Sequence, residues 1–263
     1  MQLETVTQRP TANAHPTPIL FVHGAWHGAW CWENFLPYFA ERGYESHALS
    51  LRGHGASQGH DGIRARHRGA DYVADVAQAA SQLTRPPILI GHSMGGYVIQ
   101  KYLETYTAPA AVLLAPAPVG GVLPFFLRMA ARRPLPSLQA HLTWNGYALI
   151  ATPALAREAF FSADLPQENV QQHFSRLGQE SYRAGLDMAL FALPQPRKVS
   201  PPPMLVLGAE NDAVFTRAEI ETTARAYNAQ IEFSPNMAHD MMLEPGWHQV
   251  AERIIAWLKE KGL

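Results

Sequence analysis

The sequence has little of what marks secreted, membrane-spanning or disulfide-stabilised proteins. It contains a single cysteine, Cys31, so no internal disulfide can form, and a lone cysteine without a thiolate-stabilising context indicates a packed side chain. The polar N-terminus lacks the apolar core of a secretion signal, and no hydrophobic run has the length needed to cross a bilayer. We therefore expect a soluble, cytoplasmic protein that does not insert into membranes.

An excess of charge and the common metal-binding spacings are also missing. The formal net charge is -1, which gives no long-range attraction to phosphate backbones, so nucleic acid is not an expected partner. The twelve histidines include no His-Glu-x-x-His or Cys/His spacing. His54, His60 and His67 fall in a polar loop and are interpreted as solvated side chains. The sequence predicts neither a metal nor another cofactor.

What the sequence does contain is an alternation of short apolar runs with helical patterns. The chain has 263 residues, of which 47% are hydrophobic, enough for a large buried core. Short continuous apolar runs are typical of strands buried on both faces. The predicted strands cover residues 19–22, 46–51, 88–90, 111–114, 203–207 and 230–233. Strands alternating with helices predict an α/β fold with a mostly parallel central sheet flanked by helices.

The alternation is interrupted between about residues 118 and 200. This segment shows helix-like pieces broken by prolines and no convincing strand. We interpret residues 118–200 as an inserted helical cap and residues 1–117 and 201–263 as the core; a looser set of surface helices is the alternative. Residues 1–17 are weakly patterned and predict at most a short leading strand or hairpin.

Polar residues indicate where two of the core helices begin. Asp71 has the position of an N-cap for a helix whose Val73 and Val76 belong to its apolar stripe. Thr216 and Glu219 have the spacing of a capping box for a helix that extends to about residue 227.

A glycine-flanked serine follows the strand at residues 88–90, in the stretch Gly91-His-Ser-Met-Gly95. A serine hydroxyl is a poor nucleophile unless a tight turn holds it exposed beside a base. Gly91 and Gly95 leave room for such a turn, and a helical pattern follows. These features make Ser93 the candidate nucleophile, and they assign His92 to packing or to support of the turn.

A nucleophilic serine needs a histidine base and a carboxylate that orients it. His239 lies just after the last predicted strand, where a loop at the carboxyl edge of the sheet could reach Ser93. Asp212, after the preceding strand, is the predicted acid, with Glu210 as the alternative. Asp240 is poorly placed to orient the ring of its own neighbour.

Two backbone N–H groups must also point to where negative charge develops on the substrate carbonyl oxygen. The predicted donors are Met94, directly after the serine, and Ala25, after the strand at residues 19–22. Trp26 is the alternative donor, and its side chain is a predicted pocket wall together with Phe125, Trp144 and Met241. Such apolar residues could instead simply pack the cap onto the core.

With these residues in place, the chain resembles α/β-hydrolase-fold proteins over roughly residues 19–115 and 203–260. Three features match that fold: the order of Ser93, Asp212 and His239 along the chain, the His23-Gly24 loop, and the later Arg-Gly-His-Gly loop. The segment His-Gly-Ala-Trp-His-Gly-Ala-Trp-Cys-Trp is similar to the branch that contains plant methylesterases, hydroxynitrile lyases and bacterial esterases. The lyases typically have threonine and lysine where this chain has Gly24 and Asp240, which favours the esterase side.

The resemblance and the residues together predict a serine hydrolase that cleaves carboxylic esters through an acyl-enzyme. Uncharged esters with short or medium acyl chains are the expected small-molecule substrates, and activity should fall below about pH 6.5, the ordinary histidine pKa. A carbon–carbon bond hydrolase or a cofactor-free perhydrolase would use the same triad. A non-catalytic ligand receptor on this fold is the alternative from another class. The sequence does not indicate an oligomeric state.

Overall fold

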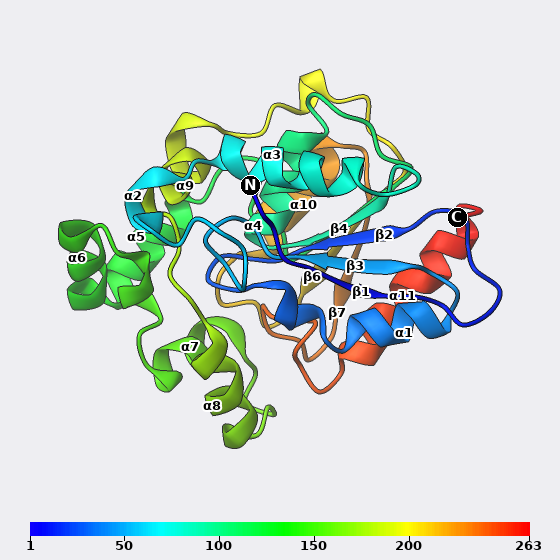
Figure 1. Cartoon of the computed structure of the whole chain (residues 1–263). Helices are drawn as coiled ribbons and strands as arrows, with labels where there is room; N and C mark the ends of the chain where they lie inside the picture. Colours follow the sequence, from blue (N-terminus) through cyan, green and yellow to red (C-terminus); the bar gives the residue numbers. More distant parts are fainter.

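The computed structural model describes the backbone of the whole chain and every side chain except that of Arg64 (Figure 1). Over these residues, seven strands form one sheet in the order β1-β3-β2-β4-β5-β6-β7. β1 pairs antiparallel with β3, and the other neighbouring strands are parallel, which confirms the α/β class. The strands are β1 (Thr5–Gln8), β2 (Ile19–Val22), β3 (Ser46–Leu49), β4 (Ile88–His92), β5 (Ala111–Leu114), β6 (Met204–Ala209) and β7 (Gln230–Ser234).

Helices cover both faces of the sheet (Figure 1). One face carries α3 (Gly69–Ser81), α4 (Met94–Tyr102) and α10 (Arg217–Ala226), and the other carries α1 (Phe35–Glu41) and α11 (Trp247–Glu260). The central strands β2 to β6 are therefore buried along their whole length, as the apolar runs of β2, β5 and β6 predict; β3 is buried although it contains Ser46 and His47. β1, the single leading strand, is exposed at the edge of the sheet.

The start of α3 corrects the assignment of Asp71 as an N-cap. The cap residue is Arg68, and Asp71 lies in the first turn, where its carboxylate accepts a hydrogen bond from the Arg68 N–H at 2.8 Å. The buried face of α3 also differs from the predicted stripe: Val73 is only partly buried, whereas Asp75 is fully buried. Apolar periodicity could not reveal this face, because it is completed by an ion pair between Asp75 and Arg52 at 2.6 Å.

Two other local predictions are confirmed. At α10 the Thr216 side chain and the Glu219 carboxylate form the capping box, so each accepts a hydrogen bond from the other residue's backbone N–H. The Cys31 side chain is fully buried in the core, and burial raises the pKa of its thiol well above the ordinary value.

The segment between β5 and β6 is a helical insertion at the carboxyl edge of the sheet (Figure 1). Several of its prolines lie in the first turns of helices, where the missing N–H costs nothing, so these prolines begin helices rather than break them. Its α-helices are α5 (Leu123–Arg132), α6 (Pro134–Thr143), α7 (Pro153–Phe160), α8 (Gln167–Arg176) and α9 (Tyr182–Leu186), followed by a π-helical turn at Asp187–Phe191. A short helix, α2 (Ile63–Arg66), packs against α9 from the core side. Among the described residues, none of the helices combines the length and the apolar character that a membrane crossing requires.

Candidate active site

Ser93 occupies a tight turn between β4 and α4. Its backbone has φ 51° and ψ -115°, a strained conformation for a residue other than glycine. The turn is possible because the chain passes very close to itself on both sides of the serine. A Cβ atom on Gly91 would lie 2.6 Å from the Gly95 carbonyl oxygen, and one on Gly95 would lie 2.2 Å from the Val22 carbonyl oxygen. The glycines therefore let β4 turn directly into α4 with Ser93 at the apex.

The fold brings Ser93, His239 and Asp212 into one hydrogen-bonded series from three loops at the carboxyl edge of the sheet. The His239 Nε2 atom lies 2.9 Å from the Ser93 hydroxyl, and its Nδ1 atom lies 2.9 Å from Asp212 Oδ2. The other Asp212 oxygen accepts the backbone N–H groups of Val214 and Phe215 at 2.7 and 3.0 Å, which fixes the carboxylate. Because a carboxylate only accepts, Nδ1 carries the proton and Nε2 is left to accept the serine proton.

Opposing effects act on the buried imidazole of His239. Burial is the largest and disfavours the charged ring, but the charge and hydrogen bond of Asp212, together with the charge of Asp240, outweigh it. The pKa of His239 is consequently raised above the ordinary 6.5. Glu210, the alternative acid in the sequence, is exposed and contributes no contact to His239.

The two predicted oxyanion donors lie beside the serine. Met94 is the first residue of α4, where a backbone N–H has no partner within the helix. Ala25 follows β2 and, like Met94, lines the same cavity as Ser93. The N–H of Trp26, the alternative donor, already donates to Glu180 Oε2 at 3.3 Å. Because the Trp26 N–H is already hydrogen-bonded, the Ala25 N–H is the better candidate for the second oxyanion donor.

Glu180 is a site residue that sequence reasoning missed. It lies between α8 and α9, yet its carboxylate is buried against the core, where Oε1 accepts the Tyr72 hydroxyl at 2.6 Å. The same segment also binds the Trp26 carbonyl, through the Gly178 N–H at 2.7 Å. The insertion thus hydrogen-bonds both the N–H and the carbonyl of Trp26, whose backbone has a positive φ of 66°. This contact fixes the loop that carries Ala25.

The interpretation of His54 and His67 as solvated is wrong, since both are buried. His54 donates from Nδ1 to the Arg52 carbonyl at 3.1 Å and from Nε2 to Glu180 at 3.0 Å, so the ring carries both protons. Burial lowers the pKa of His54, but the charge and hydrogen bond of Glu180 outweigh burial, so the pKa of His54 is raised above its ordinary value. For Glu180, burial raises the pKa, but the opposing effects, of which His54 is the largest, bring this pKa below its ordinary value. His67 hydrogen-bonds the Gly59 carbonyl at 2.7 Å, and His60 is exposed.

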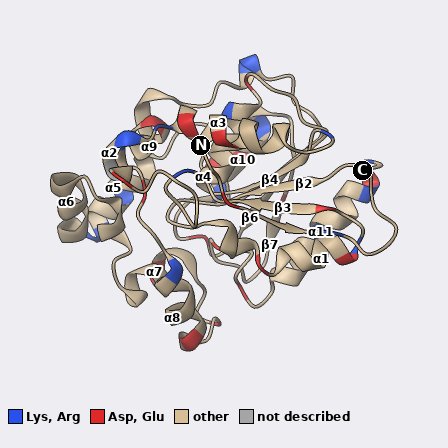
Figure 2. Ribbon diagram, viewed as in Figure 1, with Lys and Arg blue, Asp and Glu red and all other residues tan. Residues whose placement is uncertain are grey.

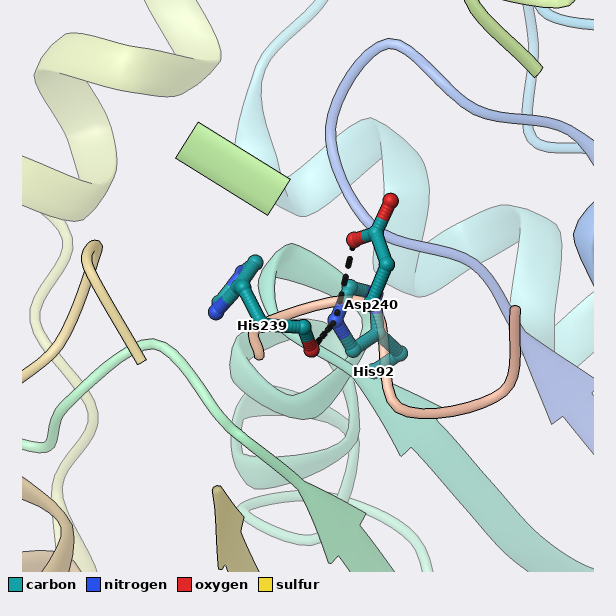
Figure 3. Close-up of side chains that lie close together, drawn as sticks. All are labelled: His92, His239 and Asp240. Carbon is teal, nitrogen blue, oxygen red and sulfur yellow. Dashed lines mark hydrogen bonds and ion pairs between the residues drawn. The ribbon is translucent and has the colours of Figure 1, made fainter. Parts of the chain in front are cut away.

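A second buried cluster supports the loop of His239 from behind (Figure 3). His92 Nε2 donates to the His239 backbone carbonyl at 3.0 Å and lies 3.6 Å from Asp240 Oδ1. Burial, reinforced by the charge of His239, lowers the pKa of His92 to about 3, so this ring stays neutral. Asp240 turns its other oxygen to His27, at 3.0 Å. His92 thus supports the turn and the loop, in agreement with its predicted role.

His92, His239 and Asp240 are also the residues of the described chain best gathered to hold a metal, with potential ligand atoms within 4.8 Å of one another. The donor set does not fit that use. Both ring nitrogens of His239 are engaged, one by Asp212 and one by Ser93. Metal binding there would require His239 to give up one of these two contacts, so the three residues do not fit a metal site.

Ser93 opens into an apolar cavity between the sheet edge and the insertion, which we call the first chamber. Trp26 and Phe125, two of the predicted pocket walls, line it, as do Phe160 and Phe215. The other two predicted walls lie elsewhere. Trp144 follows α6, is 50% exposed and packs against Tyr182, whereas Met241 is fully buried in the core.

Comparison with known proteins places this geometry in a class. Residues 19–253 match the model of the alpha/beta hydrolase family, and the chain belongs to that family. It is 31% identical to the probable esterase PIR7A of Oryza sativa subsp. indica over 106 residues, 39% of this chain and 40% of that protein. It is 35% identical to a non-heme chloroperoxidase of Streptomyces lividans over 105 residues, 38% and 37% of the two chains. The matches therefore span about two fifths of the length of these curated relatives.

Among solved structures, the monoacylglycerol lipase of Paleococcus ferrophilus superposes with a TM-score of 0.75 at 18% identity. The superposition covers 99% of this chain and 100% of the lipase. At that identity the likeness shows the fold alone. The family model and the fold place this chain among the alpha/beta hydrolase proteins, and its reaction depends on the residues of its own site.

Proposed function

We propose that this chain is a carboxylesterase-type serine hydrolase. The hydrogen-bonded series Ser93, His239 and Asp212, opening into an apolar chamber, is the observation that supports it. Ser93 attacks the acyl carbon while His239 takes its proton, and Asp212 stabilises the imidazolium that forms. The N–H groups of Ala25 and Met94 stabilise the oxyanion. His239 then protonates the leaving alcohol, and a water molecule activated by the same imidazole releases the acid.

The proposed substrates are uncharged esters with short or medium acyl chains. The first chamber is lined mainly by apolar side chains, and the desolvation of a charged acyl group there would be unfavourable. We further propose that residues 118–200 form a cap over a core of residues 1–117 and 201–263.

A fluorophosphonate probe should label Ser93, and a panel of nitrophenyl esters should show a preference for neutral acyl groups. Failure of labelling, or preference for charged acids, would contradict the proposal.

A perhydrolase is the second candidate, favoured by the similarity to the Streptomyces lividans chloroperoxidase. The same acyl-enzyme would then be attacked by hydrogen peroxide instead of water, giving a peracid. The two reactions are distinguished by supplying peroxide during ester turnover. Peracid formation that competes with hydrolysis at millimolar peroxide would identify perhydrolysis, and unchanged acid release would exclude it.

The pKa of His239 predicts the pH dependence of the reaction. His239 acts as a base only in its neutral form, so activity is lost as the pH falls through its pKa. Because that pKa is raised, the acid limb of kcat/KM should have its midpoint above pH 6.5, higher than the sequence alone predicts. The profile for 4-nitrophenyl butyrate measures it. A midpoint at or below pH 6.5 would contradict the charge balance described around the ring.

Replacement of Glu180 by glutamine should lower kcat by about tenfold and change KM less. The amide keeps the size of the side chain but cannot accept hydrogen bonds at both ends, so the Trp26 N–H loses its fixed partner and the oxyanion loop loosens. The exposed Glu168→Gln on α8 is the matched control. Equal losses in the two variants, or a change in KM alone, would contradict a positioning role for Glu180.

A further inference from the structure

A second apolar cavity lies inside the helical insertion, and we call it the second chamber. It is enclosed mainly by α5, α6, α9 and the turn at Asp187–Phe191. Six residues line both this cavity and the first chamber, so the two cavities are adjacent. The residues that line both are Ala25, Trp26, Phe126, Met129, Leu149 and Met188.

The second chamber reaches the surface through an apolar rim. Leu123, Leu127 and Leu190 line the chamber and are also exposed, Leu127 by 63%. No acidic residue occurs anywhere between residues 105 and 157, and in Figure 2 α6 is drawn almost entirely without charge. Exposed apolar side chains gathered around a cavity mouth are typical of a site that admits an apolar ligand.

Inside the chamber, polar atoms are left without a partner. The Ser137 hydroxyl on α6 belongs to a residue that is only 5% exposed, and none of the described residues hydrogen-bonds it. The indole N–H of Trp26, a residue that lines both chambers, is also buried, and no hydrogen-bond partner for it occurs among the described residues. Because unpaired buried polar groups are costly, they indicate a ligand that supplies the missing acceptor.

We propose that the second chamber binds one substituent of the ester substrate, a large apolar alkyl or aryl group that carries a hydrogen-bond-accepting oxygen. Ser93 and the first chamber hold the ester carbonyl and the smaller substituent, and the ester passes into the second chamber among the side chains that line both. The large group enters past the leucine rim, fills the space between α5, α6 and α9, and places its oxygen against Ser137 or the Trp26 indole. This inference rests on the proposed esterase function and names the substrate class for the same site.

Gly185→Leu tests the chamber by filling it. Gly185 lines the second chamber, and a Cβ added there would meet only Phe126, at 3.8 Å, so a side chain can begin at this position without a backbone conflict. The matched control is Gly120→Leu, because a Cβ there meets nothing within 4 Å and the residue is exposed. Decan-2-one, a long ketone that mimics the ester but cannot be hydrolysed, is titrated calorimetrically into each protein. We expect Gly185→Leu to weaken binding at least about tenfold and Gly120→Leu to leave it unchanged.

Equal affinity in both variants overturns the proposal. If Gly185→Leu unfolds at a lower temperature than the wild-type protein, Ala140→Phe provides an independent filling of the same chamber from α6, where Ala140 is buried. The ketone binds without turnover, so this result does not depend on catalysis. Hydrolysis of 4-nitrophenyl acetate, which needs only the first chamber, tests the esterase function separately. Normal acetate hydrolysis with no loss of ketone affinity would reject the second chamber and retain the esterase.

The polar anchor is tested with ketones of equal length in which an ether oxygen replaces one methylene, for example 8-methoxyoctan-2-one. Moving the oxygen along the chain should identify one position that binds several-fold better than its neighbours. Ser137→Ala should remove that preference while leaving decan-2-one affinity unchanged; if it persists, Trp26→Phe should remove it. If no position of the ether oxygen improves binding, water is the hydrogen-bond partner of the Ser137 hydroxyl and the Trp26 indole, and the oxygen-bearing part of the proposal is overturned.

Discussion

Replacing Ser93 with alanine should lower the turnover of 4-nitrophenyl butyrate by about four to six orders of magnitude. The hydroxyl is the group that His239 hydrogen-bonds at 2.9 Å, and without it no acyl-enzyme can form. What remains is the contribution of substrate binding and the oxyanion donors. Alanine has no steric conflict in the turn, because the close approaches there involve Gly91 and Gly95 rather than the serine side chain.

The comparison that isolates this effect is Ser175→Ala, an exposed serine on α8. Both variants should unfold at the temperature of the wild-type protein, and only Ser93→Ala should lose labelling by a fluorophosphonate. Retention of most esterase activity in Ser93→Ala would end the proposed mechanism. Loss of activity with labelling intact at another serine would move the nucleophile elsewhere.

The fold was predictable because its signals are local. Most of the central strands are short apolar runs buried on both faces, and the turn at Ser93 is marked by glycines at positions where a larger residue would meet the backbone. The capping box at Thr216 and Glu219 likewise lies within four consecutive residues. These features appear as short patterns in the sequence, so they can be recognised without knowing which segments meet in space.

The contacts of Glu180 and His54 could not be predicted in that way. The two residues lie 126 positions apart, and neither has an apolar or capping pattern that marks it as buried. The same limit applies to the buried face of α3, because Asp75 on that face is paired with Arg52, which lies in a different segment. The Arg-Gly-His-Gly loop is the signal that the sequence does contain, since a polar loop at the carboxyl edge of the sheet can meet a buried partner from the insertion.

Replacing Asp212 with asparagine is expected to lower kcat by about ten-thousandfold. The Asp212 carboxylate accepts two backbone N–H groups on one oxygen and His239 Nδ1 on the other. An amide in the same place can turn its NH₂ group toward Nδ1, which stabilises the tautomer with the proton on Nε2. That tautomer cannot accept the Ser93 proton. Removing the charge also removes the main effect that raises the His239 pKa, so the remaining activity should have its acid limb at lower pH.

Two further variants decide which acid is responsible. Glu210→Gln changes an exposed side chain without contact to His239, and its kcat should be unchanged. Asp240→Asn breaks the buried contact with His27, so it should lower the unfolding temperature while kcat falls by less than about tenfold, because Asp212 still orients the ring. If Asp240→Asn abolished turnover and Asp212→Asn did not, the carboxylate beside His239 in the sequence would be the catalytic one, and the hydrogen bond at 2.9 Å would have no part in the reaction.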